Sequence, residues 1–574
     1  MLVRNWPVIL MLALSAVPCA TARLLHVAQK PLAGVPADSQ VGTIGEAAMQ
    51  LQSGDTMLIH GGVYREAVVI NKGGTAERPI TMRAAEGEPV IITGADRITD
   101  WSQTPGDERV YSTRWTHRFV TWNKHYTHPN DDYHRLIGRC DQVFIDGYPL
   151  HQVLERGQLS RGTFFVDTDD QQLYIQPAGN QEITGDKAMV EASTREQILR
   201  VKGSYVVVKG IRFRYAPNRA QQGAVQFSGD HVTVEDCIFE YTNASGAEFT
   251  GQDITVRNCS FQHNGQLGFG ANRAHRLRMT GCTVRDNNIK GFDRGWEAGG
   301  NKICLTRGAI LENSTFIENR GNGIWFDIGN EDCEVRNCLI AHNENAGIFY
   351  EISYGLRAHD NVIIGNGFAF TPGAWGAAAG ISLSSSPFCT VERNLILGNK
   401  EGLNFREQLR TTPRIDGKSE PVWNHDQTIR HNVFAYNRDA QVWGWFDVPD
   451  ERHWPKAMQP AQPASPDKES KASASQPTGL SLEDLKLTFE DNLYCPGPGQ
   501  GLFNWGVTWK KNKRYESLDA VQKELSLDGG SKVVEFHVDD YSAVNLRVAP
   551  DSPAVIMDCY PHGTVPGTRL GTLP

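Results

Sequence analysis

Two carboxylates stand at matching places in two similar segments of the sequence. Asp327 ends the run Gly-Ile-Trp-Phe-Asp, and Glu351 ends the run Gly-Ile-Phe-Tyr-Glu, 24 residues further along the chain. If the two carboxyl groups meet, one can act as a nucleophile and the other as a general acid and base. Whether they meet depends on the structural unit that repeats between them.

That unit recurs many times. Segments of the form apolar-x-apolar-x-x-small-x-apolar follow one another, mostly 22 to 26 residues apart. Ten such copies predict a solenoid, and short alternating strands broken by Gly and Asn predict an all-β parallel β-helix. The small position is occupied in turn by Ile211, Cys237, Cys259, Cys282, Ser314, Cys338, Asn361, Asn394, Asn432 and Asn492.

The small position also bears on the eleven cysteines of the chain. Cysteine is small and apolar enough to pack in a column inside the coils, and asparagine can form hydrogen bonds along such a column. We therefore expect Cys237, Cys259 and Cys282 to be reduced packing residues rather than disulfide partners.

The flanking sequence divides the chain further. Ile44, Ala47, Ala48 and Leu51 have helical spacing and predict a helix that covers the first coil. The expected organisation is a signal peptide at 1–22, a cap and first coils at 23–99, an inserted β-rich module at 100–190, the main β-helix at 191–454, a flexible Pro/Ser-rich loop at 455–479, and a last coil with a C-terminal cap at 480–574.

Composition and the N-terminus limit the partners and the location. The formal charge of −9, with basic residues scattered, argues against a nucleic-acid partner. Arg4, the apolar stretch 8–17 and the small residues 20–22 are typical of a cleaved secretion signal. No later apolar stretch is longer, so we expect no membrane span and a secreted or periplasmic protein.

Strand alternation predicts which side chains share a surface. With Ile324 and Phe326 pointing inward, Trp325 and Asp327 point outward, and Phe349 and Glu351 do so one coil later. Polar and aromatic side chains on an exposed parallel sheet suit a saccharide substrate. The candidate binding residues are Trp325, Phe349, Asn272, Ser384, Asn404 and Arg406, together with Trp296, Glu297 and Lys302 from the segment 294–308.

The carboxylate pair is open to more than one interpretation. Equivalent positions on adjacent strands lie about 4.8 Å apart, and like charges there repel, so stacking alone does not explain the pair. Two carboxyls about 5 to 5.5 Å apart are what a retaining glycosidase requires, and their proximity raises one pKa. The alternatives are two solvated acids or a calcium site. A two-carboxylate mechanism requires no cofactor.

Four histidines form a second group of possible metal ligands. They lie at positions 117, 125, 128 and 134, in a segment that the inserted module contains. A metal site is one interpretation of this group, but the intervals match no standard zinc pattern and the sequence does not favour it.

These segments resemble a known enzyme family. "GIWFD" followed by "GIFYE", the N-terminal "GDTMLIHGGVYREAVV" and the placement of the insert are similar to glycoside hydrolase family 120. That family consists of β-xylosidases on a right-handed parallel β-helix of the pectin-lyase type. The resemblance implies that Asp327 is the nucleophile and Glu351 the acid/base.

Three functions therefore remain. The first is an exported retaining glycoside hydrolase. The second is a lyase of uronate-containing polysaccharides, for which Lys302 or Arg406 would supply the base. The third is a non-catalytic β-helix that binds glycans, since the fold alone permits all three. The sequence does not specify the oligomeric state.

Overall fold

The structure is a computed structural model of the chain. It describes residues 21–119, 136–137, 139–184, 187–369, 378–407, 410–446, 485–507 and 511–573. Most of the predicted signal peptide, three of the four histidines (positions 125, 128 and 134) and the Pro/Ser-rich loop 455–479 lie outside the described residues. In the described part, no helix is long and apolar enough to cross a membrane.

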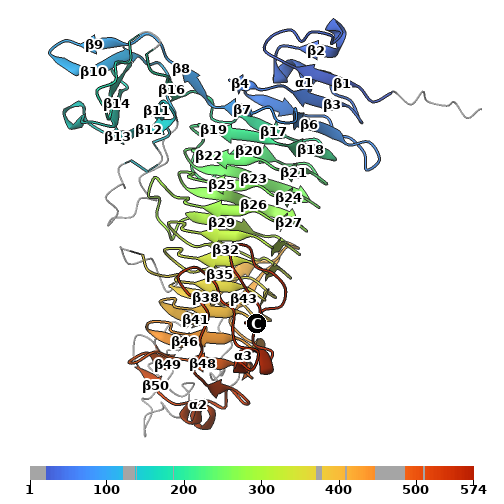
Figure 1. Ribbon diagram of the computed structural model, residues 1–574, viewed down its shortest axis with the longest axis vertical. Helices are drawn as coiled ribbons and strands as arrows, with labels where there is room; N and C mark the ends of the chain where they lie inside the picture. The colour runs from blue at the N-terminus through green and yellow to red at the C-terminus, as the bar shows by residue number, and fades with distance from the viewer. Residues whose placement is uncertain are drawn as a thin grey trace, which may run out of the picture.

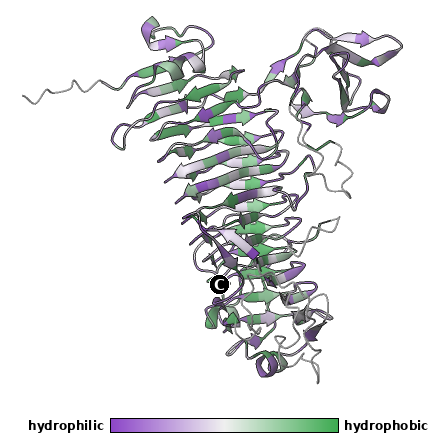
Figure 2. Ribbon diagram, turned by 180° about the vertical axis from the view of Figure 1, so that it is seen from behind, coloured by the Kyte–Doolittle hydropathy of each residue, from purple (hydrophilic) through white to green (hydrophobic). Residues whose placement is uncertain are grey.

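The described chain winds into stacked coils, each contributing one strand to each of three long parallel sheets (Figure 1). Hydrophobic residues recur in the strands along the whole stack (Figure 2). One coil cannot bury its inward side chains alone, whereas neighbouring coils share one continuous core. The predicted all-β, parallel β-helix is confirmed.

The strands of the three sheets are as follows, in spatial order. Sheet 1 contains β2 (Gln40–Val41), β1 (Leu24–Val27), β3 (Thr56–Ile59), β6 (Ile80–Ala84), β18 (Val206–Lys209), β21 (Thr233–Glu235), β24 (Thr255–Arg257), β27 (Arg278–Thr280), β30 (Ile310–Glu312), β33 (Glu334–Arg336), β36 (Arg357–His359), β39 (Thr390–Glu392), β44 (Gln427–Arg430) and β47 (Leu487–Glu490). Sheet 2 contains β4 (Gly62–Tyr64), β7 (Val90–Thr93), β19 (Ile211–Arg214), β22 (Ile238–Glu240), β25 (Ser260–Gln262), β28 (Thr283–Arg285), β31 (Thr315–Ile317), β34 (Leu339–Ala341), β37 (Val362–Ile364), β40 (Leu395–Leu397), β45 (Val433–Ala435), β48 (Leu493–Cys495) and β51 (Lys532–Val533). Sheet 3 contains β5 (Val68–Ile70), β17 (Leu199–Val201), β20 (Gly223–Phe227), β23 (Ser245–Gln252), β26 (Leu267–His275), β29 (Gly299–Cys304), β32 (Ile324–Asp327), β35 (Ile348–Glu351), β38 (Ala379–Ser384), β41 (Glu401–Glu407), β46 (Ala440–Phe446), β49 (Gly501–Val507) and β50 (Lys511–Tyr515), the last of which is antiparallel to β49.

Two columns of buried side chains lock the coils in register. At the small position, Asn361 Nδ2 donates to Asn394 Oδ1 at 2.9 Å, and Asn394 repeats the contact with Asn432. Cys237, Cys259 and Cys282 are free thiols buried in the same column, as predicted. A second asparagine ladder, absent from the sequence prediction, runs along the turns between sheets 2 and 3 from Asn264 to Asn437, through Asn287, Asn319, Asn343, Asn366 and Asn399.

Both ends of the solenoid are covered. Helix α1 (Ile44–Gln50) buries its apolar face on the first coils, and Thr43 caps it by accepting from the Glu46 N–H at 3.2 Å. At the far end, helix α2 (Leu518–Leu525) inserts Val521 into the core. The chain then turns back and runs along the outer side of sheet 2, through the short helix α3 (Pro553–Ile556), which the sequence did not predict.

The inserted module stands beside the first coils (Figure 1). One antiparallel sheet consists of β12 (Tyr148–Pro149), β11 (Val143–Ile145), β16 (Val190–Ser193) and β8 (Ala95–Arg97). The other consists of β13 (His151–Val153), β14 (Thr163–Asp167), β15 (Gln172–Gln176), β10 (Asp107–Arg114) and β9 (Ser102–Thr104). Asp146 and Gly147 both have positive φ, at 50° and 85°, which is the backbone that a tight hairpin turn requires.

Candidate active site

The register of sheet 3 brings the two carboxylates together. Strands β32 and β35 pair in parallel with Trp325 opposite Phe349 and Phe326 opposite Tyr350. The next position along both strands places Asp327 beside Glu351. Because adjacent strands lie about 4.8 Å apart, the two carboxyl groups are nearest neighbours on the outer side of the sheet.

The remaining outward positions form two rows across the strands. The carboxylate row contains Asn272, Cys304, Asp327, Glu351, Ser384 and Arg406. The aromatic row beside it contains Gly270, Lys302, Trp325, Phe349, Ser382 and Asn404. Seven of the nine predicted binding residues therefore share one surface with the pair; the exceptions are Trp296 and Glu297, which precede β29.

The surface is not exposed, contrary to the sequence prediction. Asp327 is 7% exposed and Glu351 is 8% exposed, and Trp325, Phe349, Ser384, Asn404 and Arg406 are also buried, whereas Asn272 is exposed. Part of the cover is an antiparallel hairpin of β42 (Arg410–Pro413) and β43 (Ser419–Val422). Its Val422 packs against Ile352 and Tyr354 in the turn after β35.

The hairpin approaches the turn after β32 closely. Gly329 has a φ of +64°, and a Cβ there would collide with the carbonyl of Pro413. Arg414 bonds Glu331 at 2.8 Å and lies 4.0 Å above the Tyr354 ring. The sequence contained a signal for this hairpin, the Asp416-Gly417 turn between alternating residues, which the prediction missed.

Asp327 is held by a cation on one side. Lys302 Nζ lies 2.9 Å from Asp327 Oδ2 and 3.1 Å from Glu297 Oε1, and 4.5 Å from the centre of the Trp325 ring. Burial acts to lower the pKa of Lys302, but the carboxylates of Asp327 and Glu297 outweigh it and raise that pKa. Lys302 is therefore a fixed positive charge. Asp327 Oδ1 is buried and has no hydrogen-bond partner among the described residues.

Glu351 has a different environment. Trp325 Nε1 donates to Glu351 Oε2 at 3.2 Å, and Arg410 of the hairpin forms an ion pair with Oε1. Burial raises the pKa of Glu351, the charge of Asp327 raises it further, and Arg410 and Arg406 oppose the shift. The carboxylates are thus not equivalent: Asp327 contacts a lysine, whereas Glu351 contacts Trp325 and an arginine, and burial with the charge of Asp327 raises the pKa of Glu351.

The aromatic residues beside the pair position it. The rings of Trp325 and Phe349 stack on each other with centroids 5.6 Å apart and planes at 26°. With Ala346 they form a small buried cluster, and Trp325 offers its indole N–H to Glu351. The predicted role as an open platform for sugar rings is therefore corrected, since both rings are buried and stacked on each other.

Trp296 takes no part in the arrangement around Asp327. Its ring lies 6.3 Å from that of Phe292 and packs against a cluster with Ile137 and Ala298. Its neighbour Glu297 does reach the site, through Lys302. Of the three residues predicted in segment 294–308, Lys302 contacts Asp327 and Glu297 contacts Lys302, whereas the indole of Trp296 packs near Phe292.

The pair does not fit the calcium alternative. Cations of the chain itself already contact both carboxylates, Lys302 at Asp327 and Arg410 at Glu351. Within the described ranges, no group of three or more His, Cys, Asp or Glu side chains is placed to hold a metal ion. Lysine and arginine next to the carboxylates would repel a divalent cation. The geometry instead favours proton transfer and nucleophilic attack.

Comparison with known proteins supports the fold. A family model described as a right handed beta helix region matches residues 171–303 and 222–396. A search of curated protein sequences finds no match. The chain is a right-handed parallel β-helix protein, and its predicted resemblance to such carbohydrate-active enzymes is confirmed at the level of the fold.

Two solved structures illustrate the likeness. One, described as the complex structure of XylC with xylose, has a TM-score of 0.60 and 17% identity, and the match covers 83% of this chain and 85% of that one. Another, described as a glycoside hydrolase, has a TM-score of 0.50 and 13% identity, and the match covers 67% of this chain and 94% of that one. At these identities the likeness concerns the fold.

Proposed function

We propose that the protein is a retaining glycoside hydrolase in which Asp327 is the nucleophile and Glu351 the acid/base. The observation that carries this proposal is the contrast between the two carboxylates. Asp327 has one oxygen bound to Lys302, and its other oxygen is buried with no hydrogen-bond partner among the described residues. Glu351, on the adjacent strand, has a raised pKa. A retaining enzyme needs one ionised nucleophile and one protonated acid about 5 to 5.5 Å apart.

The proposed reaction uses Asp327 as the ionised nucleophile and Glu351 as the protonated acid. Asp327 Oδ1 attacks the anomeric carbon while the Glu351 carboxyl donates its proton to the glycosidic oxygen. The bond from carbon to leaving-group oxygen breaks, the alcohol departs, and the sugar remains as an ester of Asp327. Glu351, now ionised, takes a proton from water, whose oxygen attacks the same carbon and releases Asp327. Lys302 balances the charge of Asp327 before the ester forms and after it is hydrolysed.

Neighbouring polar groups are suited to hold the sugar. Ser382 Oγ, Ser384 Oγ and Asn404 Oδ1 are buried beyond Glu351 and have no hydrogen-bond partner among the described residues. Leaving such groups unsatisfied costs about 1–3 kcal/mol each, a cost that hydroxyl groups of a bound sugar would remove. Because the structure described as XylC contains xylose and the sequence resembles β-xylosidases, we propose a β-xyloside as substrate.

A polysaccharide lyase is the second candidate. Burial lowers the pKa of Arg406 to about 9, which brings this side chain nearer to the range of a base. Lys302, the other candidate base, is held protonated by two carboxylates. The carboxylate pair also has the wrong charge for a uronate polymer. The hydrolase is therefore the better supported of the two.

A panel of substrates tests the proposal. The hydrolase should release the chromophore from an aryl β-xyloside, and NMR of the first product should show retained anomeric configuration. A 2-fluoro aryl xyloside should leave a sugar ester on Asp327, detected by mass spectrometry of the peptide. An inverted first product would refute the mechanism, and ultraviolet absorbance from an unsaturated uronate would establish the lyase.

Export is part of the same proposal. The segment 1–22 has the positive start, apolar stretch and small residues of a secretion signal. The N-terminus of the protein collected outside the cytoplasm should begin near residue 23. An unprocessed N-terminus retained in the cytoplasm would contradict export without affecting the assignment of the carboxylates.

A further inference from the structure

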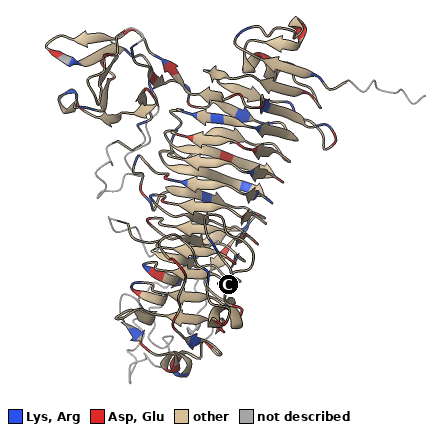
Figure 3. Cartoon of the chain, viewed as in Figure 1, with Lys and Arg blue, Asp and Glu red and all other residues tan. Residues whose placement is uncertain are grey.

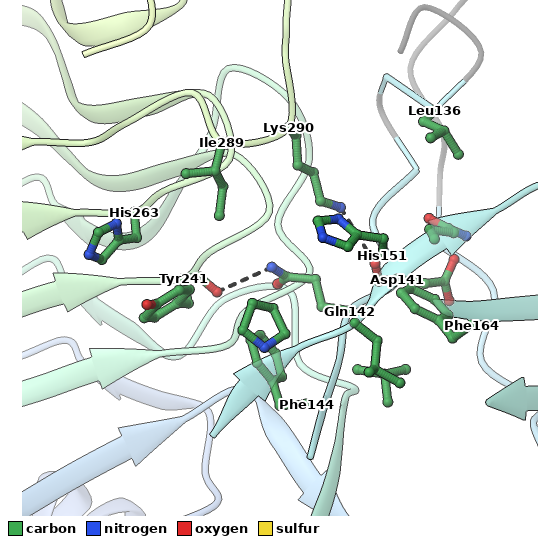
Figure 4. Close-up of a pocket in the computed structure, with 14 residues that line it drawn as sticks. Leu136, Asp141, Gln142, Phe144, His151, Phe164, Tyr241, His263, Ile289 and Lys290 are labelled. Atoms are coloured by element: carbon green, nitrogen blue, oxygen red, sulfur yellow. Dashed lines mark hydrogen bonds between the residues drawn. The ribbon is translucent and has the colours of Figure 1, made fainter. Parts of the chain in front are cut away.

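A cavity of about 310 Å³ lies between the inserted module and the coils, outside the carboxylate site (Figure 4). The module contributes Gln142, which directly precedes β11, Phe144 of β11 and His151 of β13, among others. The coils contribute Tyr241, His263 and Lys290, from the turns that lead into β23, β26 and β29 of sheet 3. These strands belong to the sheet whose outer side carries Asp327 and Glu351. We call this cavity the module pocket.

Its walls are largely aromatic and aliphatic. The rings of Tyr241 and His263 stack with centroids 5.1 Å apart and planes at 26°. Phe144 meets Tyr241 edge-on, at 6.2 Å and 80°. Figure 4 shows these rings on one side of Gln142 and the module residues His151 and Phe164 on the other. Such walls favour a ligand with a flat apolar surface.

One polar group in the pocket is incompletely satisfied. The Gln142 side chain is 7% exposed, and its Nε2 donates to the Tyr241 carbonyl at 3.2 Å. This contact fixes the orientation of the amide, because a carbonyl cannot accept from the amide oxygen. Gln142 Oε1 is buried without a hydrogen-bond partner in the described part of the chain. A ligand hydroxyl would supply the missing donor.

The charged groups at the pocket do not favour an ion. Lys290 Nζ donates to the carbonyl of Arg139 at 2.8 Å, to that of Asp141 at 3.4 Å and to Asn243 Oδ1. An ammonium has three donors, so these contacts leave none for an anion. Burial raises the pKa of Asp141, whose Oδ1 accepts from Trp115 Nε1 at 3.3 Å. The ligand is therefore a neutral molecule that combines an apolar face with hydroxyl groups.

We propose that the module pocket is an ancillary binding site for a neutral sugar unit, separate from the carboxylate pair. A hydrocarbon would leave Gln142 Oε1 unsatisfied, whereas a sugar ring presents both an apolar face to Tyr241 and hydroxyls to Gln142. The identity of the sugar rests on the proposed function, from which we take xylose. The inserted module thereby takes part in binding the saccharide.

Titration calorimetry with xylotriose tests the pocket directly. The measurement uses full-length Asp327→Asn protein, which should not consume the ligand. This protein should bind two xylotriose molecules per chain. Adding Tyr241→Ala should weaken the second site roughly tenfold or more, as loss of an aromatic contact does. Adding Gln142→Leu, which keeps the aromatic walls, should weaken the same site to a similar extent.

Tyr205→Ala is the matched control. Tyr205 stacks on His231 at 4.5 Å, at another turn of the coils, and neither residue lines the pocket. This control should keep two sites. One site per chain before any pocket substitution, or a second site that survives both Tyr241→Ala and Gln142→Leu, would overturn the proposal. Phenol that binds the pocket where xylotriose does not would overturn it as well.

The outcomes separate the pocket from the proposed function. If wild-type protein hydrolyses no aryl glycoside while Tyr241→Ala still removes one xylotriose site, the hydrolase fails and the pocket stands. If hydrolysis is seen and the second xylotriose site is absent, the pocket proposal is refuted and the hydrolase proposal is supported. Tyr241→Ala should leave kcat/KM on a small aryl xyloside within about twofold, since the pocket lies outside the carboxylate site.

Discussion

The coils that carry Asp327, Glu351, Ser384 and Arg406 have two covered outer faces with opposite chemistry. On sheet 2, outward residues such as Leu339, Val362 and Leu395 are apolar and pack against Phe536, Leu546 and Val548 of the C-terminal segment. On sheet 3, the outward residues of the same coils are carboxylates, serines and an arginine under the β42–β43 hairpin.

The C-terminal segment on sheet 2 stabilises the fold, whereas the hairpin on sheet 3 encloses the candidate active site. Apolar groups buried against apolar groups lower the free energy of the fold. Buried polar atoms without partners raise it, and Asp327 Oδ1, Ser382 Oγ and Ser384 Oγ on sheet 3 have no hydrogen-bond partner in the part of the chain that the structure describes. Charge gives no comparable contrast along the described part of the stack, where Lys and Arg are interspersed with Asp and Glu (Figure 3). The contrast lies in these two faces.

The largest expected effect is on the carboxylate face. Asp327→Asn removes the nucleophile, so kcat should fall by about 10⁴-fold or more on every glycoside. Lys302 keeps its contact with Glu297, so the melting temperature should change little. Asp253→Asn, which breaks an ion pair with Arg276 at the surface, is the control and should retain activity. Full activity in Asp327→Asn would exclude this site.

Glu351→Ala should show a different kinetic defect. Loss of the acid should cost about 10²–10⁴-fold on substrates with poor leaving groups, and less on an activated aryl xyloside. Azide should restore turnover by attacking the sugar ester in place of water, and the azide product should keep the anomer of the substrate. NMR of that product determines its anomeric configuration. An inverted azide product would indicate that the two roles are exchanged.

Phe536→Ala should show the opposite pattern on the apolar face. Phe536 is 3% exposed, and truncating a buried phenylalanine costs about 3–5 kcal/mol of unfolding free energy. Denaturant unfolding measures this loss, while kcat per folded molecule should be unchanged. Val533→Ala, in the same segment but half exposed, should stay within about 0.5 kcal/mol of wild type. Equal losses of unfolding free energy in both variants would contradict a specific stabilising role for the buried Phe536 ring.

Arg410→Gln should move the pH profile. Arg410 lowers the pKa of Glu351 against the effects of burial and Asp327, so its removal should raise that pKa. The acid must be protonated to act, and the basic limb of kcat/KM should therefore shift to higher pH. Arg307→Gln, whose partner is Glu331 and not Glu351, should leave the limb in place. A shift to lower pH would contradict the assignment of Glu351 as the acid.

The smallest effect is expected for Ser384→Ala, which compares the contribution of one hydroxyl to substrate binding with its contribution to stability. Ser384→Ala removes a buried hydroxyl that has no partner among the described residues, so unfolding free energy should stay equal or rise by up to about 1 kcal/mol while KM increases. Ser314→Ala should lower the unfolding free energy and leave KM unchanged. Its hydroxyl donates to the Glu312 carbonyl at 2.7 Å and accepts from the Cys282 N–H at 3.0 Å. A loss of stability in Ser384→Ala would show that this hydroxyl is structural.

The sequence alone determined the repeat and therefore the fold. Alternation within each strand and the recurring small residue specify which side chains point inward, and the 24-residue interval sets Asp327 and Glu351 on neighbouring coils. These are local and periodic properties. In a solenoid each repeat contacts its neighbours, so equivalent positions of successive coils stack.

The tertiary structure alone decided the environment of the pair. Arg410 is 59 residues from Glu351 and belongs to a hairpin outside the repeat, so no periodicity could place it there. The direction of Trp296, the burial of the carboxylates and the return of the C-terminal segment along sheet 2 are likewise long-range contacts. The pKa of a carboxyl depends on burial and on charges brought from distant parts of the chain, and the sequence therefore named the two acids but left their protonation to the fold.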